Sequence, residues 1–245
     1  MAKVVRLIWR FDFQVSYAYL DRRGSALKVL AETVDRFFDN YGPGQLPFSL
    51  VAEKVEQDKS FTTLSWEMTC LNGSSEWPAG LDMSRVFEGP LIRGVDRIVR
   101  DALKLGEVRV LSRAGVRLFV AEKFAKRTER TAMDRIGGLT SSRFKEGLSA
   151  TVGPPDDVAF IYEGADADGL KYRVQFGPFA RKNLTLTFLR NWGDASQALD
   201  ENDLFFDIDI YQQNFSFVEH SLYRWASTKV SKAANLVEFC AKSIE

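Results

Sequence analysis

In two segments that lie far apart in the chain, an apolar residue occurs at every second position and polar residues occupy most of the positions between. The two segments are residues 3–13, KVVRLIWRFDF, and residues 204–213, LFFDIDIYQQ. Successive side chains of a strand point to opposite faces, so this alternation predicts two half-buried strands of an antiparallel sheet. On the first strand, the apolar face is expected to hold Val5, Leu7, Trp9, Phe11 and Phe13.

The first half of the chain shows the order strand, helix, strand, strand, helix, strand. The expected elements are a strand at 3–13, a helix at 21–41, strands at 48–57 and 61–71, a loop at 72–80, a helix at 89–105 and a strand at 107–124. Gly106 is expected to end the second helix in a left-handed conformation, and Gly115 to kink or bulge the last strand. This βαββαβ order predicts an α+β fold with a ferredoxin-like half at residues 1–121.

The rest of the chain predicts a second β-rich half. Residues 122–153 are highly charged and are expected to form a partly helical connector. Residues 154–245 are expected to form an antiparallel sheet and a long C-terminal helix, with strands at 158–164, 169–177, 183–192 and 204–213. A capping box of Ser216 and Glu219 precedes the helix, whose apolar face is expected to lie across the sheet or, alternatively, to dock a partner.

The charge and cysteine counts restrict the possible partners. Lys and Arg total 33, as do Asp and Glu, which argues against a dominant nucleic-acid or membrane surface. Cys70 and Cys240 lack the spacing of a metal knot or of a disulfide framework. The first segment lacks the uninterrupted apolar core of a signal peptide, and no stretch approaches the ~18 apolar residues of a membrane span. We therefore expect a cytoplasmic protein without membrane contact.

Asp207 and Asp209 are the most conspicuous candidate site residues. On a strand they share one face, roughly 6.6 Å apart, a spacing that suits a divalent metal or an acid and base pair. The same spacing suits carboxylates that meet arginines on the next strand, and residues 107–124 supply Arg113 and Arg117. We favour the second interpretation, a structural ion-pair face, with ligand binding by these four residues as the alternative.

Other chemistry has weaker support in the sequence. His220 is the sole histidine, and its expected place at a helix N-terminus disfavours a catalytic imidazolium. The segment 177–183, GPFARKN, could hold a phosphate through Arg181 and Lys182, but we favour a basic turn without a ligand. Asp166 and Asp168 lack the Glu of a calcium loop and predict a polar hairpin turn. We expect no catalytic residue, no metal and no cofactor.

RNA binding is a further possibility, because ferredoxin-like sheets bind single strands through aromatic side chains on an exposed face. Here Trp9, Phe11 and Phe13 are in phase with Leu7 and are expected in the core. That arrangement leaves, at most, binding of the RNA backbone.

Two short signatures resemble a sporadically distributed family of bacterial proteins of similar length. SRAGVRLFVAEKF, residues 112–124, resembles its Arg-hydrophobic-Gly-hydrophobic-Arg strand, and LFFDIDIYQQ before a C-terminal helix resembles its Leu-Asp-Ile-Asp-Val ending. The resemblance marks Gly115, Arg117, Asp207 and Asp209. This chain departs from the family's Pro-x-Val-Glu-Ala start, since it has AKVVRLIWRFDF there. The family has no settled activity, and its patchy occurrence implies accessory, mobile-element or defence-associated genes.

Together these features predict a protein that acts by binding rather than by catalysis. We expect it to be a component of a bacterial accessory or defence-associated system, with a protein partner or self-association. The first alternative is an enzyme or sensor for a nucleotide or phosphate that uses Asp207 and Asp209 with strand arginines. The second alternative is RNA-backbone binding.

Overall fold

The computed structural model describes residues 2–32, 38–46, 48–87, 90–122, 136–153, 158–178, 203–216 and 221–244. The elements named below are β1 (Lys3–Asp12), α1 (Tyr17–Asp21), α2 (Arg23–Glu32), β2 (Asn40–Pro43), β3 (Leu50–Val55), β4 (Phe61–Trp66), β5 (Cys70–Asp82), α3 (Pro90–Leu105), β6 (Leu111–Glu122), α5 (Ser142–Val152), β7 (Phe160–Ala165), β8 (Lys171–Pro178), β9 (Leu204–Phe215) and α7 (Leu222–Ile244). A short 3₁₀ turn, Met83–Arg85, precedes α3. The protein is thus a mixed α+β structure.

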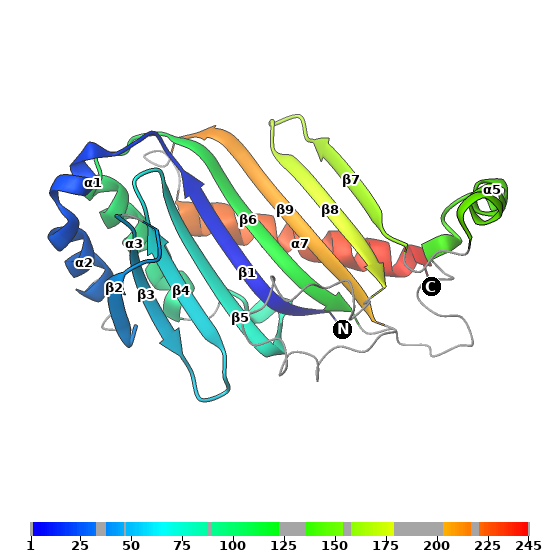
Figure 1. Ribbon diagram of the computed structural model, residues 1–245, viewed down its shortest axis with the longest axis horizontal. Helices are drawn as coiled ribbons and strands as arrows, with labels where there is room; N and C mark the ends of the chain where they lie inside the picture. Colours follow the sequence, from blue (N-terminus) through cyan, green and yellow to red (C-terminus); the bar gives the residue numbers. More distant parts are fainter. Residues whose placement is uncertain are drawn as a thin grey trace.

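All nine described strands form one antiparallel sheet in the order β2-β3-β4-β5-β1-β6-β9-β8-β7 (Figure 1). The three central strands β1, β6 and β9 come from distant parts of the sequence, and β6 pairs with both others. The described strands of the second half, β7, β8 and β9, therefore continue the sheet of the first half instead of forming a sheet of their own. The domain boundaries at residues 121 and 153 stay a prediction.

Three helices cover one face of this sheet. Helix α7 contacts β6 and β9, α3 contacts α7, and α2 contacts α3 and β3. Figure 1 shows α3 and α7 behind the strands. The strand side chains that meet the helices are apolar and buried, and they include Leu7, Trp9, Phe11, Val116, Leu118, Phe206, Ile208 and Ile210. Burial of each of the larger side chains contributes about 1.5–3 kcal/mol of hydrophobic stabilisation.

The alternation in the two opening segments is confirmed, with one exception. β1 and β9 turn alternate apolar residues to the helices, as predicted. Val5 departs from the pattern because the register of β1 shifts between Val4 and Arg6. Val4 consequently joins the main core, and Val5 packs on the other face with Phe119 and Ala121.

The predicted loop at 72–80 is wrong, because these residues belong to β5. Strand β5, rather than the predicted strand at 61–71, pairs with β1 along its length. Gly73 lies opposite Trp9, and a Cβ atom there would come within 1.9 Å of the Trp9 ring. Glycine at this position therefore makes room for a core tryptophan, which explains why a strand carries a residue typical of loops.

The helix predicted at 21–41 differs from the structure at both ends. Helix α1 begins at Tyr17, the described part of α2 reaches Glu32, and Tyr41 lies in β2, where it pairs with Ala52 of β3. The helix predicted to begin near residue 89 is confirmed as α3. After α3 the left-handed residue is Glu107, with φ of 56°, not Gly106. The Gly106 carbonyl instead accepts a hydrogen bond of 2.6 Å from the Ser16 hydroxyl.

The hairpin β7–β8 confirms the strands predicted at 158–164 and 169–177 and the polar turn between them. One carboxylate oxygen of Asp166 accepts hydrogen bonds from the backbone N–H groups of Asp168 and Leu170. In the connector, α5 supplies the expected helical part and lies apart from the sheet (Figure 1). The strand predicted at 183–192 falls outside the described residues.

The C-terminal helix lies on the sheet, as predicted. Its buried side chains are Leu222, Trp225, Val230, Ala233, Val237 and Ile244. Glu219 of the predicted capping box lies outside the described residues. At the described start of α7, the Ser221 hydroxyl accepts a hydrogen bond from the backbone N–H of Arg224. A carboxylate oxygen of Asp96 on α3 accepts a hydrogen bond of 3.1 Å from the backbone N–H of Tyr223. No helix within the described ranges is both long and apolar enough to cross a membrane.

Candidate functional site

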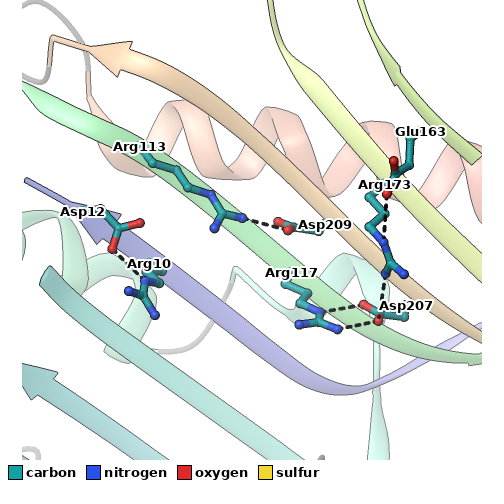
Figure 2. A network of polar contacts seen from close by, with 8 residues as sticks. All are labelled: Arg10, Asp12, Arg113, Arg117, Glu163, Arg173, Asp207 and Asp209. Atoms are coloured by element: carbon teal, nitrogen blue, oxygen red, sulfur yellow. Dashed lines mark hydrogen bonds and ion pairs between the residues drawn. The ribbon is translucent and has the colours of Figure 1, made fainter.

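The sheet face opposite the helices, which we call the polar face, carries the candidate residues. Because side chains alternate along β9, burial of Phe206, Ile208 and Ile210 against the helices places Asp207 and Asp209 on the polar face. Arg113 and Arg117 of β6 lie on the same face. Figure 2 shows both arginines extending toward the aspartates of the neighbouring strand.

Arg117 and Asp207 form a bidentate pair across β6 and β9. The Arg117 Nε donates to Oδ1 of Asp207 at 2.7 Å, and Nη2 donates to Oδ2 at 2.6 Å. Asp207 is only 8% exposed, so this pair is shielded from water on the carboxylate side. The hydrogen bonds to Asp207 raise the pKa of Arg117 above its ordinary value. Such a fork-to-fork pair fixes both side chains and satisfies both carboxylate oxygens.

Arg113 forms a second pair with Asp209, at 2.7 Å between Nη2 and Oδ2. Arg113 lies across from Gln213 in the strand register, so its side chain must run back along the sheet to reach Asp209. On the way its guanidinium lies 4.4 Å from the centre of the Tyr211 ring. The side chain passes close to Gly115, where an added Cβ would lie 3.5 Å from the Arg113 Nε, an ordinary van der Waals contact. The strand pairs in regular register on both sides of Gly115, so the bulge expected as one alternative is absent at this position.

Burial governs the acidity of Asp209. It raises the pKa of this carboxyl above its ordinary value, although the nearby guanidinium of Arg113 acts in the opposite direction. The environment of Asp209 thus favours the protonated form more than water does.

Arg173 of β8 extends the same row of charges. Its Nε donates to Glu163 of β7 at 3.1 Å, and its Nη1 lies 3.9 Å from Oδ2 of Asp207. At the other end, Arg10 and Asp12 of β1 pair at 2.7 Å. We call these eight residues the ion-pair row (Figure 2): Arg10, Asp12, Arg113, Arg117, Glu163, Arg173, Asp207 and Asp209. The row crosses the five neighbouring strands β1, β6, β9, β8 and β7. It holds four arginines and four carboxylates.

A related pair lies beside the row on β1 and β5. Arg6 Nε donates to the Ser74 hydroxyl at 3.0 Å and lies 3.3 Å from a carboxylate oxygen of Glu76. Glu76 is 5% exposed. Burial is the largest influence on Arg6 and lowers the pKa of its guanidinium. The β5 segment once expected to be a loop therefore contributes a buried acid to the polar face.

The geometry supports the ion-pair interpretation of Asp207 and Asp209 at the level of contacts. Each carboxylate accepts hydrogen bonds from an arginine of β6. In the part of the chain that the structure describes, no group of three or more His, Cys, Asp or Glu side chains is placed to hold a metal ion. A role of these four residues in ligand binding stays a prediction. Arg181, Lys182 and His220 lie outside the described residues.

A groove beside the ion-pair row went unnoticed in the sequence. It has a volume of about 690 Å³ over β6, β9, β8 and β7, and its lining includes Arg113, Lys171, Arg173, Asp209, Tyr211 and Gln213. Tyr211 and Gln213 continue the alternation of Asp207 and Asp209 along the strand, so the sequence pattern could have predicted that they lie on the polar face. Lys171 joins them only because β8 pairs with β9 and sets it opposite Tyr211.

The fold and the site together define an α+β protein with helices on one face of an antiparallel sheet and an arginine and carboxylate row on the other. Comparisons with protein-family models, with curated proteins and with solved structures found no match for this chain. Its function must therefore be inferred from its own geometry.

Proposed function

We propose that this protein acts by binding a partner protein, and that the polar face of its sheet is the recognition surface. One observation carries the proposal: each of the four carboxylates in the ion-pair row is bound by an arginine. A carboxylate held in this way has little capacity left to act as a general base or to bind a metal. The row is therefore suited to recognition and to structural rigidity.

The balance of charge favours a protein partner over a nucleic acid. The ion-pair row joins four arginines to four carboxylates, so its formal charges cancel. Nucleic-acid backbones bind surfaces with a surplus of Lys and Arg. Alternating charges of both signs provide the complementarity that orients protein partners. The end of the face near Arg10 and Gln213 is the accessible end, since both residues are exposed.

Finer assignments belong to the same proposal. The strand order β6-β1-β5-β4 supports a ferredoxin-like unit at the N-terminal part, extended at its edge by β3 and β2. The resemblance of the β6 and β9 segments to the bacterial family supports a role in an accessory or defence-associated system. Cys70 and Cys240 are free thiols, which supports a location in the reducing cytoplasm.

Photo-crosslinking from defined positions tests the recognition surface. A benzophenone amino acid is placed at Gln213 on the polar face and, as a matched control, at Lys28 on α2, whose side chain is 69% exposed. Irradiation in cells is expected to give a discrete protein adduct from position 213 and none from position 28. Adducts from position 28 alone, or none from either position, would contradict the proposal.

A further inference from the structure

We propose that the groove over β8 and β9 binds the phosphate group of a small phosphate ester. The lining of this groove includes Arg113, Lys171, Arg173, Asp209, Tyr211 and Gln213. This inference goes beyond the proposed protein partner and does not depend on it. It rests on three lining residues that are not part of the ion-pair row, namely Lys171, Tyr211 and Gln213.

The first step is the charge of the groove. Its two acids, Asp209 and Glu163, are each held by an arginine. Lys171 adds a further positive charge, and none of the described carboxylates lies within ion-pair distance of it. Its ammonium group instead lies 5.9 Å from the centre of the Tyr211 ring. Among the described residues of the groove, Lys171 therefore adds one positive charge, while the charges of the two arginines and two acids cancel.

The second step is the supply of hydrogen-bond donors. Within the described ranges, the hydroxyl of Tyr211 and the side-chain amide of Gln213 have no hydrogen-bond partner, although both line the groove. Tyr211 lies directly opposite Lys171 in the β8 and β9 register. An ammonium, a phenol and an amide on adjoining positions can all donate to the oxygens of one phosphate.

The third step is the size of the groove. Its volume of about 690 Å³ falls within the range of roughly 300–1,000 Å³ that small-molecule sites occupy. A free phosphate ion would fill a small part of this space, whereas a mononucleotide would fill much of it. The volume therefore favours a phosphate ester over the free ion. The negative charge of Asp209 in the lining is compensated, because its carboxylate is paired with Arg113.

Calorimetric titration of the full chain at low ionic strength tests the inference, with AMP, inorganic phosphate and adenosine as probes. We expect AMP to bind more tightly than inorganic phosphate, and adenosine to show no binding. Lys171→Met is expected to weaken AMP binding about 10- to 100-fold, because a charge-assisted hydrogen bond is lost. Lys28→Met, which removes an equal charge from α2, is expected to bind AMP as the wild type does.

A second variant keeps the test decisive if Lys171→Met fails to fold. Tyr211→Phe preserves the ring beneath Arg113 and removes only the hydroxyl, and it is expected to weaken AMP binding several-fold. Absence of AMP binding at millimolar concentration would overturn the inference. Equal binding of adenosine and AMP, or equal losses in Lys171→Met and Lys28→Met, would do the same. Because the crosslinking assay uses no phosphate ester, either proposal can fail while the other holds.

Discussion

Arg117 binds Asp207 through two hydrogen bonds, although the residue directly opposite Arg117 on β9 is Asp209. The guanidinium therefore reaches diagonally across the strands. This offset leaves Asp209 to Arg113, which reaches it from a position four residues earlier on β6. Two arginines and two aspartates thus make two separate pairs, and neither aspartate bridges both arginines through the hydrogen bonds described.

The Arg117 and Asp207 pair is expected to stabilise the fold. Asp207→Asn keeps the side-chain volume but leaves a half-buried guanidinium without its charged partner, so we expect a loss of about 1–3 kcal/mol in the free energy of unfolding. Urea denaturation of the wild type and the variant measures this loss. A double-mutant cycle with Arg117→Gln should give a coupling of about 1–3 kcal/mol.

Glu238→Gln serves as the control for this pair, because Glu238 forms its ion pair with Lys242 on an exposed surface of α7. It should leave stability unchanged within error. If Asp207→Asn instead preserved stability and abolished a magnesium-dependent rise in melting temperature, a metal site would replace the ion-pair interpretation.

The half-buried carboxyl of Asp209 should make stability depend on pH. Its pKa in the folded protein is raised above that of the unfolded chain, about 3.9, so the folded state binds more protons between these two values. The contribution of Asp209 to the free energy of unfolding is fully present below pH ~3.9. It is lost as the pH rises through the pKa that Asp209 has in the folded protein. Unfolding free energies at pH 3.5–7.0 should show this decline in the wild type relative to Asp209→Asn. A difference between the two that rises with pH would contradict the assignment.

Two glycines of the sheet should respond differently to alanine. At Gly73 the added Cβ would meet the Trp9 ring at 1.9 Å, so Gly73→Ala must displace a core side chain and is expected to cost about 1–3 kcal/mol. At Gly115 the nearest atom is 3.4 Å away, an ordinary contact, so Gly115→Ala should be nearly neutral. Thermal melting of both variants checks the contrast, and equal melting temperatures would refute it.

Asp96 of α3 should contribute to the stability of α7. Its carboxylate accepts from the backbone N–H of Tyr223, so it satisfies a donor that the first turn of a helix leaves without an intrahelical partner. Asp96→Ala is expected to cost about 1 kcal/mol in chemical denaturation. Asp101→Ala, on the same helix with a looser 3.9 Å contact to Arg97, should cost less than ~0.5 kcal/mol. Equal losses would show that α3 itself, not the contact with α7, is affected.

The local pattern of residues predicted much of this molecule. Alternation located β1 and β9, and it placed Asp207 and Asp209 together with arginines of β6. Residues 72–80 were missed because Gly, Ser, Asn and Pro are typical of loops, while their place in β5 depends on Trp9, which is more than 60 residues away in sequence. Lys171 was missed for a similar reason, since strand pairing alone brings it to Tyr211. Contacts across the sheet determined what the local pattern could not.

The position of β6 between β1 and β9 also has a consequence during synthesis. One edge of β6 pairs with residues 3–12, which are made before it, and the other pairs with residues 204–215, which are made after it. At ribosomal rates, roughly 10 s pass between completion of β6 and completion of β9. Throughout that interval the nascent chain lacks the partner of an apolar strand at the centre of its future sheet. The edge of β6 that will pair with β9 is therefore open to pairing with other chains until β9 is made.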